Sequence, residues 1–407
     1  MLEFTRLLRS RADSPTNSLP MHRLQISLDG NKRTSTISIG RGIRREVGNA
    51  IRESDFFKPR RVLVISNNRV FHLYGKDVIS SLKRPGLQIF EWLMPEGERF
   101  KSFRVLEEAV IFLAKHGFER NDLVVALGGG VVGDLAGFSA AVYLRGIPFI
   151  QVPTTLLAQI DSSVGGKTGI NLAVGKNMVG AFHQPPLVVI DTETLLTLPK
   201  RELVAGFCEM VKQSLIASQE LFDSTTGLLR DMKSDNRVLQ SAPFEELIAA
   251  QCSFKASIVA GDEREASGRS DAKSRRILNF GHTTAHALEA VTNYRVFRHG
   301  EAVGHGMLVA GEISKNLGLL RDEKLELLRE AVRLCGPLPK ADGLNVNQII
   351  RSLQHDKKSV GGEINWVLLE DIGLPKIVPG SLISAKLLRL SLKAGLTITT
   401  RQKGDSR

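Results

Sequence analysis

A strand–turn–helix pattern between residues 122 and 142 constrains the fold of this chain more than any other feature. The apolar run 123–127 is typical of a buried strand, and it leads directly into the glycine-rich segment 128–134. Gly128, Gly130 and Gly133 have the spacing of a dinucleotide-binding turn, in which backbone N–H groups and a helix N-terminus approach a pyrophosphate closely. The pattern predicts a nucleotide cofactor, and a tight turn without any ligand is the alternative.

The turn departs from an ordinary dinucleotide-binding unit in one respect. Such a unit carries an acidic residue that holds the ribose about 20 residues further on. The corresponding segment here is Ile147-Pro148-Phe149-Ile150-Gln151-Val152-Pro153, which has no acidic residue. If a dinucleotide binds, its adenosine end is held in another way, so the expected domain is Rossmann-like and not a standard Rossmann domain.

Length and composition indicate a two-domain globular protein. A chain of 407 residues is long for one hydrophobic core, and 42% apolar with 24% charged residues is ordinary for a globular chain. No apolar run approaches the length of a membrane span. Cys208, Cys252 and Cys335 are widely spaced and form no pair motif, which favours a reducing, cytoplasmic location. Residues 1–20 lack the apolar core of a secretory signal; we expect a flexible extension, with a transit peptide as the alternative.

The net charge of +12 does not indicate a nucleic-acid-binding protein. Residues 1–84 hold 17 Lys and Arg against 7 Asp and Glu, whereas residues 85–400 hold 35 of each. The positive excess therefore lies near the ends of the chain. Neither zinc-finger spacing nor an aromatic RNA-binding motif accompanies it.

The order of predicted elements gives the fold class. From residue 61 to 191 strand-like and helix-like segments alternate, which predicts an α/β domain with a mainly parallel sheet. Beyond residue 199 the periodicity is mostly helical, with a late hairpin at 364–377 and a last helix that Ser381 could cap. We expect a flexible segment 1–20, an α/β NAD-binding domain 21–199 and a mainly helical metal- and substrate-binding domain 200–407, with the active-site cleft between the two domains.

The helical half contains a candidate metal site. His282 and His286 are one helical turn apart, His299 follows after a short loop, and Glu209 lies on the first helix of this half. Catalytic zinc takes three protein ligands from His and carboxylate groups and leaves one position open. A histidine pair without metal is the alternative. The metalloprotease pattern is absent because the residues between the two histidines are Thr283-Thr284-Ala285.

Several cationic residues lie beside glycine or within otherwise apolar segments. They are Arg145, Lys167, Lys176 and Lys212. Each could form a plain salt bridge, but the set together favours an anionic substrate with phosphate or carboxylate groups.

These residues, in this order, resemble the 3-dehydroquinate synthase family of sugar phosphate cyclases. The likeness runs from about residue 62 to about residue 369. The motifs that carry it are Pro95-Glu96-Gly97-Glu98-x-x-Lys101, Gly128 to Asp134, Pro153-Thr154-Thr155, Asp161 to Thr168, Gly175-Lys176-Asn177, Glu209-x-x-Lys212, Asp262-Glu263, Leu278-Asn279-x-Gly281-His282-x-x-x-His286, His299 to Val303, and Asp356-Lys357-Lys358.

The resemblance implies the cofactors and the residues that bind them. NAD would be held by Asn68, Glu96, Gly97, Glu98, Arg99, Phe100, Lys101, Gly129, Gly130, Val131, Val132, Gly133, Asp134, Thr154, Thr155, Asp161, Lys167, Lys176, Thr194, Leu195, Leu196 and Thr197. One divalent ion, zinc or cobalt, would be bound by Glu209, His282 and His299.

The resemblance also implies the substrate and the reaction. The substrate residues would be Arg145, Lys167, Asn177, Lys212, Lys255, Arg275, Asn279, His286 and Lys357. The implied enzyme, a homodimer, converts 3-deoxy-D-arabino-heptulosonate 7-phosphate to 3-dehydroquinate and phosphate in the shikimate pathway. Oxidation by NAD, elimination of phosphate, re-reduction and an intramolecular aldol closure follow one another on the bound sugar.

Two segments depart from the family pattern. The stretch from Asp262 to Asn279 is about six residues longer than is usual in the family. Arg275 is the first candidate for the phosphate-binding arginine there, and Arg269 and Arg276 are alternatives. Ser66 stands where an acidic residue often contacts the ribose.

Three alternative functions remain at this point. A sister cyclase that makes a valiolone- or inosose-type ring would share the fold, NAD and metal, although Lys255, Asn279 and His286 favour the quinate-forming branch. A metal-dependent alcohol dehydrogenase of the glycerol dehydrogenase kind would release NADH, and the cation set argues against it. A non-enzymatic nucleic-acid binder would use the basic N-terminus.

Overall fold

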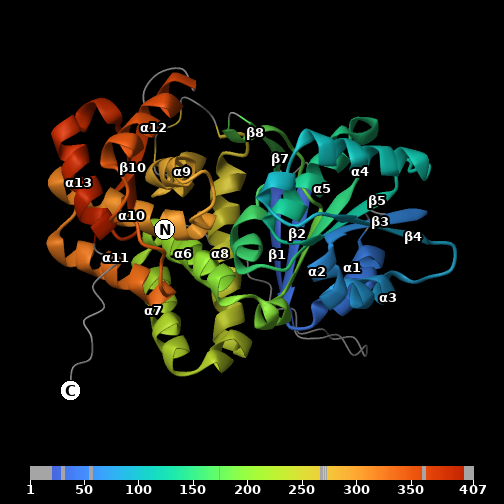
Figure 1. Cartoon of the computed structure of the whole chain (residues 1–407). Coiled ribbons are helices and arrows are strands. Elements are labelled where there is room, and N and C mark those ends of the chain that lie inside the picture. Colours follow the sequence, from blue (N-terminus) through green and yellow to red (C-terminus); the bar gives the residue numbers. More distant parts are fainter. Residues whose placement is uncertain are drawn as a thin grey trace. The chain divides into compact units, whose positions relative to one another are not determined.

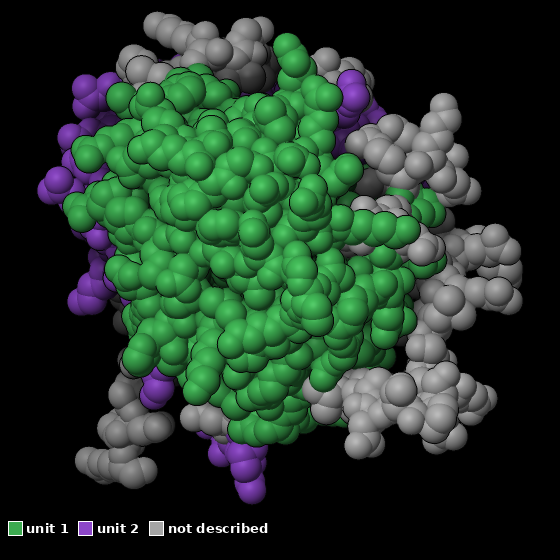
Figure 2. Space-filling view, turned by 90° about the vertical axis from the view of Figure 1, so that its right-hand side faces the viewer, with its two compact units in different colours: residues 1–198, 239–260 green, residues 199–238, 261–407 purple. Residues whose placement is uncertain are grey.

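The computed structural model describes most of the chain. It covers residues 21–28, 33–54, 58–173, 175–265, 269, 271, 273–359 and 364–397, and for residues 236 and 355–359 it describes the backbone only. The predicted extension 1–20 lies outside the described residues. Contacts group the described chain into two compact units (Figure 2). Unit 1 comprises the residues up to Leu198 together with Leu239–Ala260, and unit 2 comprises Pro199–Val238 and the residues from Gly261 onward. The predicted domains 21–199 and 200–407 stay a prediction; they differ from these units in the placement of 239–260.

Unit 1 is built on a mainly parallel seven-stranded sheet, as the sequence predicts (Figure 1). Its order is β1-β2-β9-β6-β5-β3-β4, and only the β1–β2 pair is antiparallel. The strands are β1 (Met21–Leu28), β2 (Arg33–Gly40), β3 (Arg61–Asn67), β4 (Gln88–Met94), β5 (Leu123–Gly128), β6 (Phe149–Pro153) and β9 (Leu187–Asp191). A separate antiparallel hairpin consists of β7 (Lys167–Leu172) and β8 (Gly175–Phe182).

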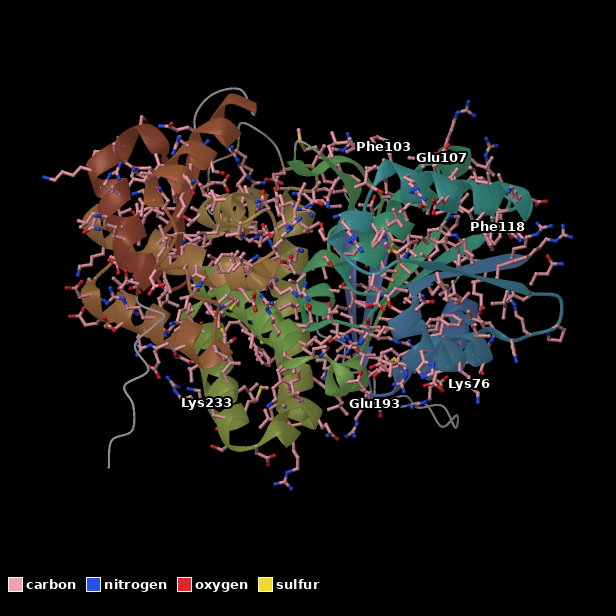
Figure 3. The ribbon with its side chains drawn as sticks, viewed as in Figure 1. Lys76, Phe103, Glu107, Phe118, Glu193 and Lys233 are labelled. Atoms are coloured by element: carbon pink, nitrogen blue, oxygen red, sulfur yellow. The ribbon has the colours of Figure 1, made fainter. Side chains whose placement is uncertain are left out.

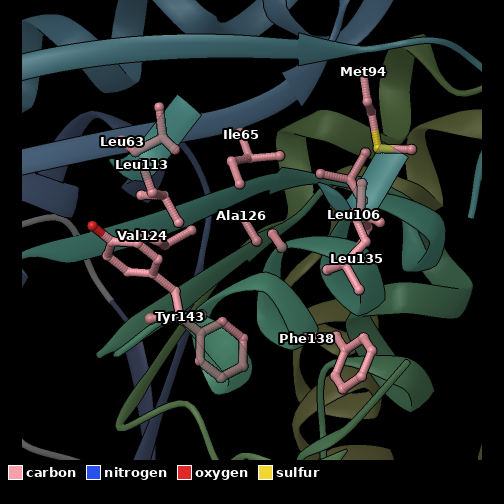
Figure 4. Close-up of a cluster of buried hydrophobic side chains, with 14 of the residues drawn as sticks. Leu63, Ile65, Met94, Leu106, Leu113, Val124, Ala126, Leu135, Phe138 and Tyr143 are labelled. Carbon is pink, nitrogen blue, oxygen red and sulfur yellow. The ribbon is translucent and has the colours of Figure 1, made fainter. Parts of the chain in front are cut away.

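Helices cover both faces of this sheet because successive strand residues point to opposite faces. Leu63 and Ile65 of β3 pack in one cluster with α4 (Phe103–Lys115) and α5 (Gly130–Val142) (Figure 4). Val62 and Val64 pack in the other cluster with α1 (Val47–Glu53) and α3 (Lys76–Leu82). Both clusters are almost fully buried, which is why β3, β5 and β6 read as continuous apolar runs. The helices of unit 1 are α1 (Val47–Glu53), α2 (Asn68–Val70), α3 (Lys76–Leu82), α4 (Phe103–Lys115), α5 (Gly130–Val142) and α8 (Ala242–Gly261).

Unit 2 is mostly helical, again as predicted. Its helix α10 is buried along most of its length and packs against α6, α9, α11, α13 and β10. The elements of this unit are α6 (Lys200–Ala217), α7 (Gln219–Ser234), α9 (His282–Val291), α10 (His299–Asn316), α11 (Asp322–Cys335), α12 (Val346–Ser359), α13 (Ala385–Thr397) and the antiparallel pair β10 (Asn365–Asp371) and β11 (Leu374–Pro379).

One capping prediction is wrong. Ser381 lies in a short 3₁₀ turn, Gly380–Leu382, that precedes the last helix. The hydroxyl of Ser384 accepts a hydrogen bond from the N–H of Leu387 at 3.2 Å and so caps α13. The sequence has two serines three residues apart, and the first of them lies within the 3₁₀ turn, so the second caps the helix.

Among the described residues, every helix is too short or too polar to span a membrane.

Candidate active site

The predicted cofactor turn has the geometry that its glycines require. β5 ends at Gly128 and α5 begins at Gly130, with Gly129 as the N-cap. A Cβ atom at Gly129 would lie 3.0 Å from the Thr155 side chain, and one at Gly130 would lie 3.0 Å from the Ser162 hydroxyl. Side chains at these positions would crowd the segment that follows β6. Glycine therefore keeps the N-terminus of α5 open, as pyrophosphate binding requires.

Three predicted site residues meet beside this turn. The Lys101 ammonium group is buried, and it donates hydrogen bonds to the side-chain oxygens of Asp134 and Asn177. Burial raises the pKa of Asp134, and the charge of Lys101 opposes that rise. Asn177 has φ of +55°, a left-handed conformation that asparagine tolerates better than most residues. The cluster connects the turn to the β7–β8 hairpin.

The segment Glu96 to Lys101 is also tied to that hairpin. The side-chain N–H of Asn171 donates to Glu98 Oε1 at 2.8 Å, and the backbone N–H of Asn171 donates to the carbonyl of Lys101 at 2.8 Å. Glu96 lines a cavity of about 740 Å³ together with Asn68 and Thr197. Three residues predicted to bind NAD from distant parts of the chain thus share one cavity.

A buried ionic network holds the predicted segment Thr194 to Thr197. Arg44, whose side chain is 7% exposed, lies 2.7 Å from Asp191 and 2.8 Å from Glu193, which is labelled in Figure 3. Burial alone would lower the pKa of Arg44, but hydrogen bonds from its guanidinium group to Glu193 and Asp191 raise it. The Tyr74 hydroxyl donates to the Thr194 carbonyl at 3.1 Å. No local sequence pattern indicates the role of Arg44, because its partners lie more than 30 residues away.

A third buried cation of unit 1 is Lys255 on α8. Its ammonium group pairs with the carboxylate of Asp161 and also donates to the Asp161 carbonyl. Lys255 was predicted to bind substrate and Asp161 to bind NAD, so the structure brings one residue of each set into contact.

The remaining predicted residues of unit 1 lie in several places. Arg145 is exposed at a turn where its φ is +66°, and it lines a cavity of about 580 Å³ with Gly146 and His183. Lys167 begins β7 and is exposed, while Lys176 lies near the start of β8. Thr154 is buried and donates its backbone N–H to Gly128 at 3.0 Å, which joins β6 to the turn.

Unit 2 brings together the three predicted metal ligands. Glu209 on α6 is fully buried, and its Oε1 lies 3.9 Å from Nε2 of His282 and 3.6 Å from Nε2 of His299. Each residue offers one ligand atom within 4.8 Å of the other two. A carboxylate with two imidazoles is a ligand set for zinc or a similar divalent ion, so the residues fit the metal that the sequence predicts.

Two small residues set the spacing of the helices that carry these ligands. A Cβ atom at Gly300 would lie 1.9 Å from the backbone oxygen of Ala205 on α6, and one at Gly306 would lie 2.0 Å from the oxygen of Gly281 beside α9. α10 therefore packs directly on backbone at both points. These contacts hold His299 near Glu209 and His282.

The predicted substrate residues of unit 2 are partly assembled around the ligands. Lys212 is buried one turn after Glu209, with its Nζ 2.7 Å from Glu209 Oε2. The ring centres of His286 and His299 are 6.0 Å apart. Asn279 is exposed and donates to Glu265 at 3.4 Å. The side chain of Lys357 lies outside the described part.

The long loop between Asp262 and Asn279 contains the three candidate arginines. Arg275 is buried and donates its backbone N–H to Asp262 at 2.9 Å and its side chain to the Glu263 carbonyl at 2.7 Å. Arg269 pairs with Asp271 at 2.9 Å. The choice of Arg275 as the substrate residue therefore stays a prediction, with Arg269 and Arg276 as alternatives.

Sequence reasoning missed one charged residue of this cluster, Glu289. Its Oε2 lies 3.4 Å from Nδ1 of His299, and the residue is 1% exposed. The available signal was its position on the face of α9 that carries His282 and His286, one turn beyond the second histidine.

Known proteins resemble this chain over most of its length. Two family models match the chain: the N-terminal part of 3-dehydroquinate synthase at residues 91–205 and the C-terminal part at residues 206–359. The 3-dehydroquinate synthase of Rippkaea orientalis (strain PCC 8801 / RF-1) is 40% identical and the match covers 81% of this chain and 88% of the relative. The 3-dehydroquinate synthase of Thermodesulfovibrio yellowstonii (strain ATCC 51303 / DSM 11347 / YP87) is 39% identical, and the match covers 88% of this chain and 96% of the relative.

A solved structure shares the fold. It is the 2-epi-5-epi-valiolone synthase from Streptomyces hygroscopicus subsp. jinggangensis 5008 with NAD+ and Zn2+ bound, with a TM-score of 0.78 and 24% identity over 89% of this chain and 96% of that one. The identity to the two synthases over most of both chains is decisive for the family. The chain belongs to the 3-dehydroquinate synthase family.

Proposed function

We infer that this chain converts 3-deoxy-D-arabino-heptulosonate 7-phosphate to 3-dehydroquinate and phosphate. Family membership supports this activity, since curated relatives at about 40% identity are 3-dehydroquinate synthases. The structural observation that carries the proposal is the convergence of Glu209, His282 and His299 from three separate helices. Glu209, His282 and His299 would hold a divalent ion, which would supply acidification of a bound sugar alcohol, and NAD would supply reversible hydride transfer.

We propose that the predicted residues of unit 1 hold NAD. The open N-terminus of α5 would receive the pyrophosphate, and the cavity beside Asn68 and Thr197 would receive another part of the dinucleotide. The reaction leaves NAD unchanged overall, so the protein must retain it between the two hydride transfers. The Arg44 network supports retention because Tyr74, whose ring lies against the Arg44 guanidinium group, donates a buried hydrogen bond to the Thr194 carbonyl.

The predicted cations would orient the anionic groups of the substrate. Lys212 is buried and its ammonium group is held by Glu209, so its position is already fixed before an anionic substrate group binds. Lys255 is fixed in the same way by Asp161. Cations that are already positioned convert binding energy into orientation of the reacting groups, which is the main contribution of the protein to this chemistry.

Phosphate release from the heptulosonate phosphate tests the proposal. We expect turnover with NAD and a divalent ion present and loss of turnover after chelation. Glu209→Ala should lose both the bound metal and turnover, whereas Glu108→Ala, at an exposed position on α4, should retain both. Retention of metal and turnover in Glu209→Ala contradicts the proposal.

Two outcomes would assign the chain to a neighbouring activity. Turnover of sedoheptulose 7-phosphate without turnover of the heptulosonate phosphate indicates a valiolone-type cyclase. Stoichiometric NADH formation with glycerol indicates an alcohol dehydrogenase.

We also propose a homodimer that works in the cytoplasm. All three cysteines are buried free thiols, which supports a reducing compartment. Analytical ultracentrifugation tests the oligomeric state, and a monomer at micromolar concentration would contradict it.

A further inference from the structure

Helix α9 carries a buried carboxylate that the metal-ligand set does not include. His282, His286 and Glu289 follow one another at spacings of four and three residues, so all three lie on one face of the helix. Glu289 is 1% exposed. A buried carboxylate on a helix face otherwise occupied by histidines needs a partner that accounts for its burial.

One partner of Glu289 is the imidazole of His299 on α10. Glu289 Oε2 lies 3.4 Å from Nδ1 of this ring, while Nε2 of the same ring lies 3.6 Å from Oε1 of Glu209. The two nitrogens of His299 therefore face two different carboxylates. One belongs to the metal-ligand set, and the other lies on the opposite side of the ring.

His282 shows the same orientation with a weaker acceptor. Its Nδ1 lies 3.2 Å from the backbone oxygen of Phe280, and its Nε2 lies 3.9 Å from Glu209 Oε1. Both rings thus direct Nε2 toward Glu209 and Nδ1 toward an acceptor.

A neutral imidazole carries its proton on one nitrogen and binds a cation with the other. An acceptor at Nδ1 fixes the proton there and leaves the Nε2 lone pair for the metal. We propose that Glu289 is a positioning residue: its carboxylate accepts the Nδ1–H of His299 and holds that ring with Nε2 toward the cation bound by Glu209 and His282. This inference deepens the proposed function and rests on it, because it concerns the same metal site.

A competing arrangement would use Glu289 as a ligand. His286, Glu289 and His299 also offer ligand atoms within 4.8 Å of one another. That group includes the exposed His286, whereas the group with Glu209 has a fully buried carboxylate toward which two Nε2 atoms point. The geometry favours the first group, and the test below separates the two.

The test uses Glu289→Gln, which keeps the size of the side chain and removes its charge. We expect its affinity for Zn2+, measured by competition with a chromogenic chelator, to be about tenfold to a hundredfold weaker than that of the wild type. At saturating Co2+ the visible absorption spectrum should keep the wild-type band positions, because the ligands are the same. Phosphate release should then recover at saturating metal.

The control is Glu312→Gln on α10, the helix that carries His299. Glu312 is also buried, 5% exposed, and it pairs with Arg329. It lies 13 residues beyond His299, about 20 Å along the helix axis. We expect this variant to lose thermal stability and to keep the wild-type metal affinity.

Three results would overturn the inference. Wild-type affinity in Glu289→Gln would show that the charge of the carboxylate does not hold the ring, because the amide oxygen of glutamine can still accept the Nδ1–H. A cobalt spectrum with altered coordination would make Glu289 a ligand. Equal weakening in Glu289→Gln and Glu312→Gln would reduce the effect to a loss of packing. If the wild-type protein binds no divalent ion, the proposed function is refuted as well. If Glu209→Ala abolishes metal binding and Glu289→Gln leaves it unchanged, only this inference is refuted.

Discussion

The contact between Gly300 and α6 allows a sharp test of how helix packing sets the metal site. Gly300 follows His299 directly, and Ala205 is one turn before Glu209 on α6. A Cβ atom at Gly300 would meet the Ala205 oxygen at 1.9 Å and its carbonyl carbon at 2.6 Å. These atoms are backbone, so a side-chain rotation cannot relieve the clash. Gly300→Ala must therefore separate the two helices.

The required movement can be estimated. An ordinary carbon–oxygen contact is about 3.3 Å, so the N-terminus of α10 must retreat from α6 by about 1.4 Å. Metal ligation tolerates errors of only about 0.2 Å. We expect zinc affinity to fall at least tenfold, and overpacking to cost about 1–3 kcal/mol of the free energy of unfolding. For a unit of this size, each loss of 1 kcal/mol in the free energy of unfolding lowers Tm by about 2–4 °C.

Gly227→Ala is the matched control for this substitution. Gly227 lies in the middle of α7, and a Cβ atom there would have no heavy atom within 4 Å. Alanine is a better helix former than glycine, so this variant should gain about 0.5–1 kcal/mol and keep its zinc affinity. Chelator competition and thermal unfolding measure both quantities. Wild-type zinc affinity and Tm in Gly300→Ala would refute the reasoning.

Three further predictions concern stability and reactivity. Arg44→Ala leaves the buried carboxylate of Asp191 without its cation and should lower the free energy of unfolding in urea by about 3–5 kcal/mol. Arg45→Ala, at a half-exposed side chain, should lower it by less than about 1 kcal/mol. Similar losses in the two variants would contradict the burial argument. Burial raises the pKa of Cys252 to about 12, so the native thiol should resist alkylation at pH 8. The free energy of unfolding should fall as pH rises from about 8.5 toward 12, because the thiol has a higher pKa in the folded state than in the unfolded state. Rapid labelling of Cys252 in the native protein, detected by mass spectrometry, would contradict this prediction. Lys324 lowers the pKa of Asp371, so the stability that this ion pair contributes is present above about pH 3.9 and is lost as pH falls below it. The loss of unfolding free energy in Asp371→Asn, measured by chemical denaturation, should therefore become smaller in acid. A loss that stays constant from pH 7 to pH 3 would refute the ion-pair origin.

The sequence predicts best the parts of the fold whose residues are buried on all sides. β5 and β6 read as strands because their apolar runs are uninterrupted, and α6 and α10 read as helices because their periodicity extends over many turns. The β7–β8 hairpin and α12 were missed. The hairpin is rich in glycine and polar residues and gives no clear apolar pattern, whereas α12 is polar on average and has only a few apolar residues at helical spacing.

The candidate site shows the same division. The predicted metal ligands lie in recognisable local motifs, and the structure brings Glu209, His282 and His299 close together. The contact of Lys101 with Asp134 and Asn177 joins residues from three distant segments, and no local pattern encodes such a pairing. Tertiary packing decides it.

Helix α8 has a consequence for synthesis of the protein. The chain leaves unit 1 after Leu198, forms α6 and α7 of unit 2, and then returns to unit 1 for Leu239–Ala260 before leaving again. As the chain emerges from the ribosome, unit 1 lacks Lys255, the partner of Asp161, until more than 250 residues have been translated. By then the first two helices of unit 2 have already emerged without α9 and α10. The two halves must therefore mature in an interleaved order, and no single cut in the chain yields either one whole.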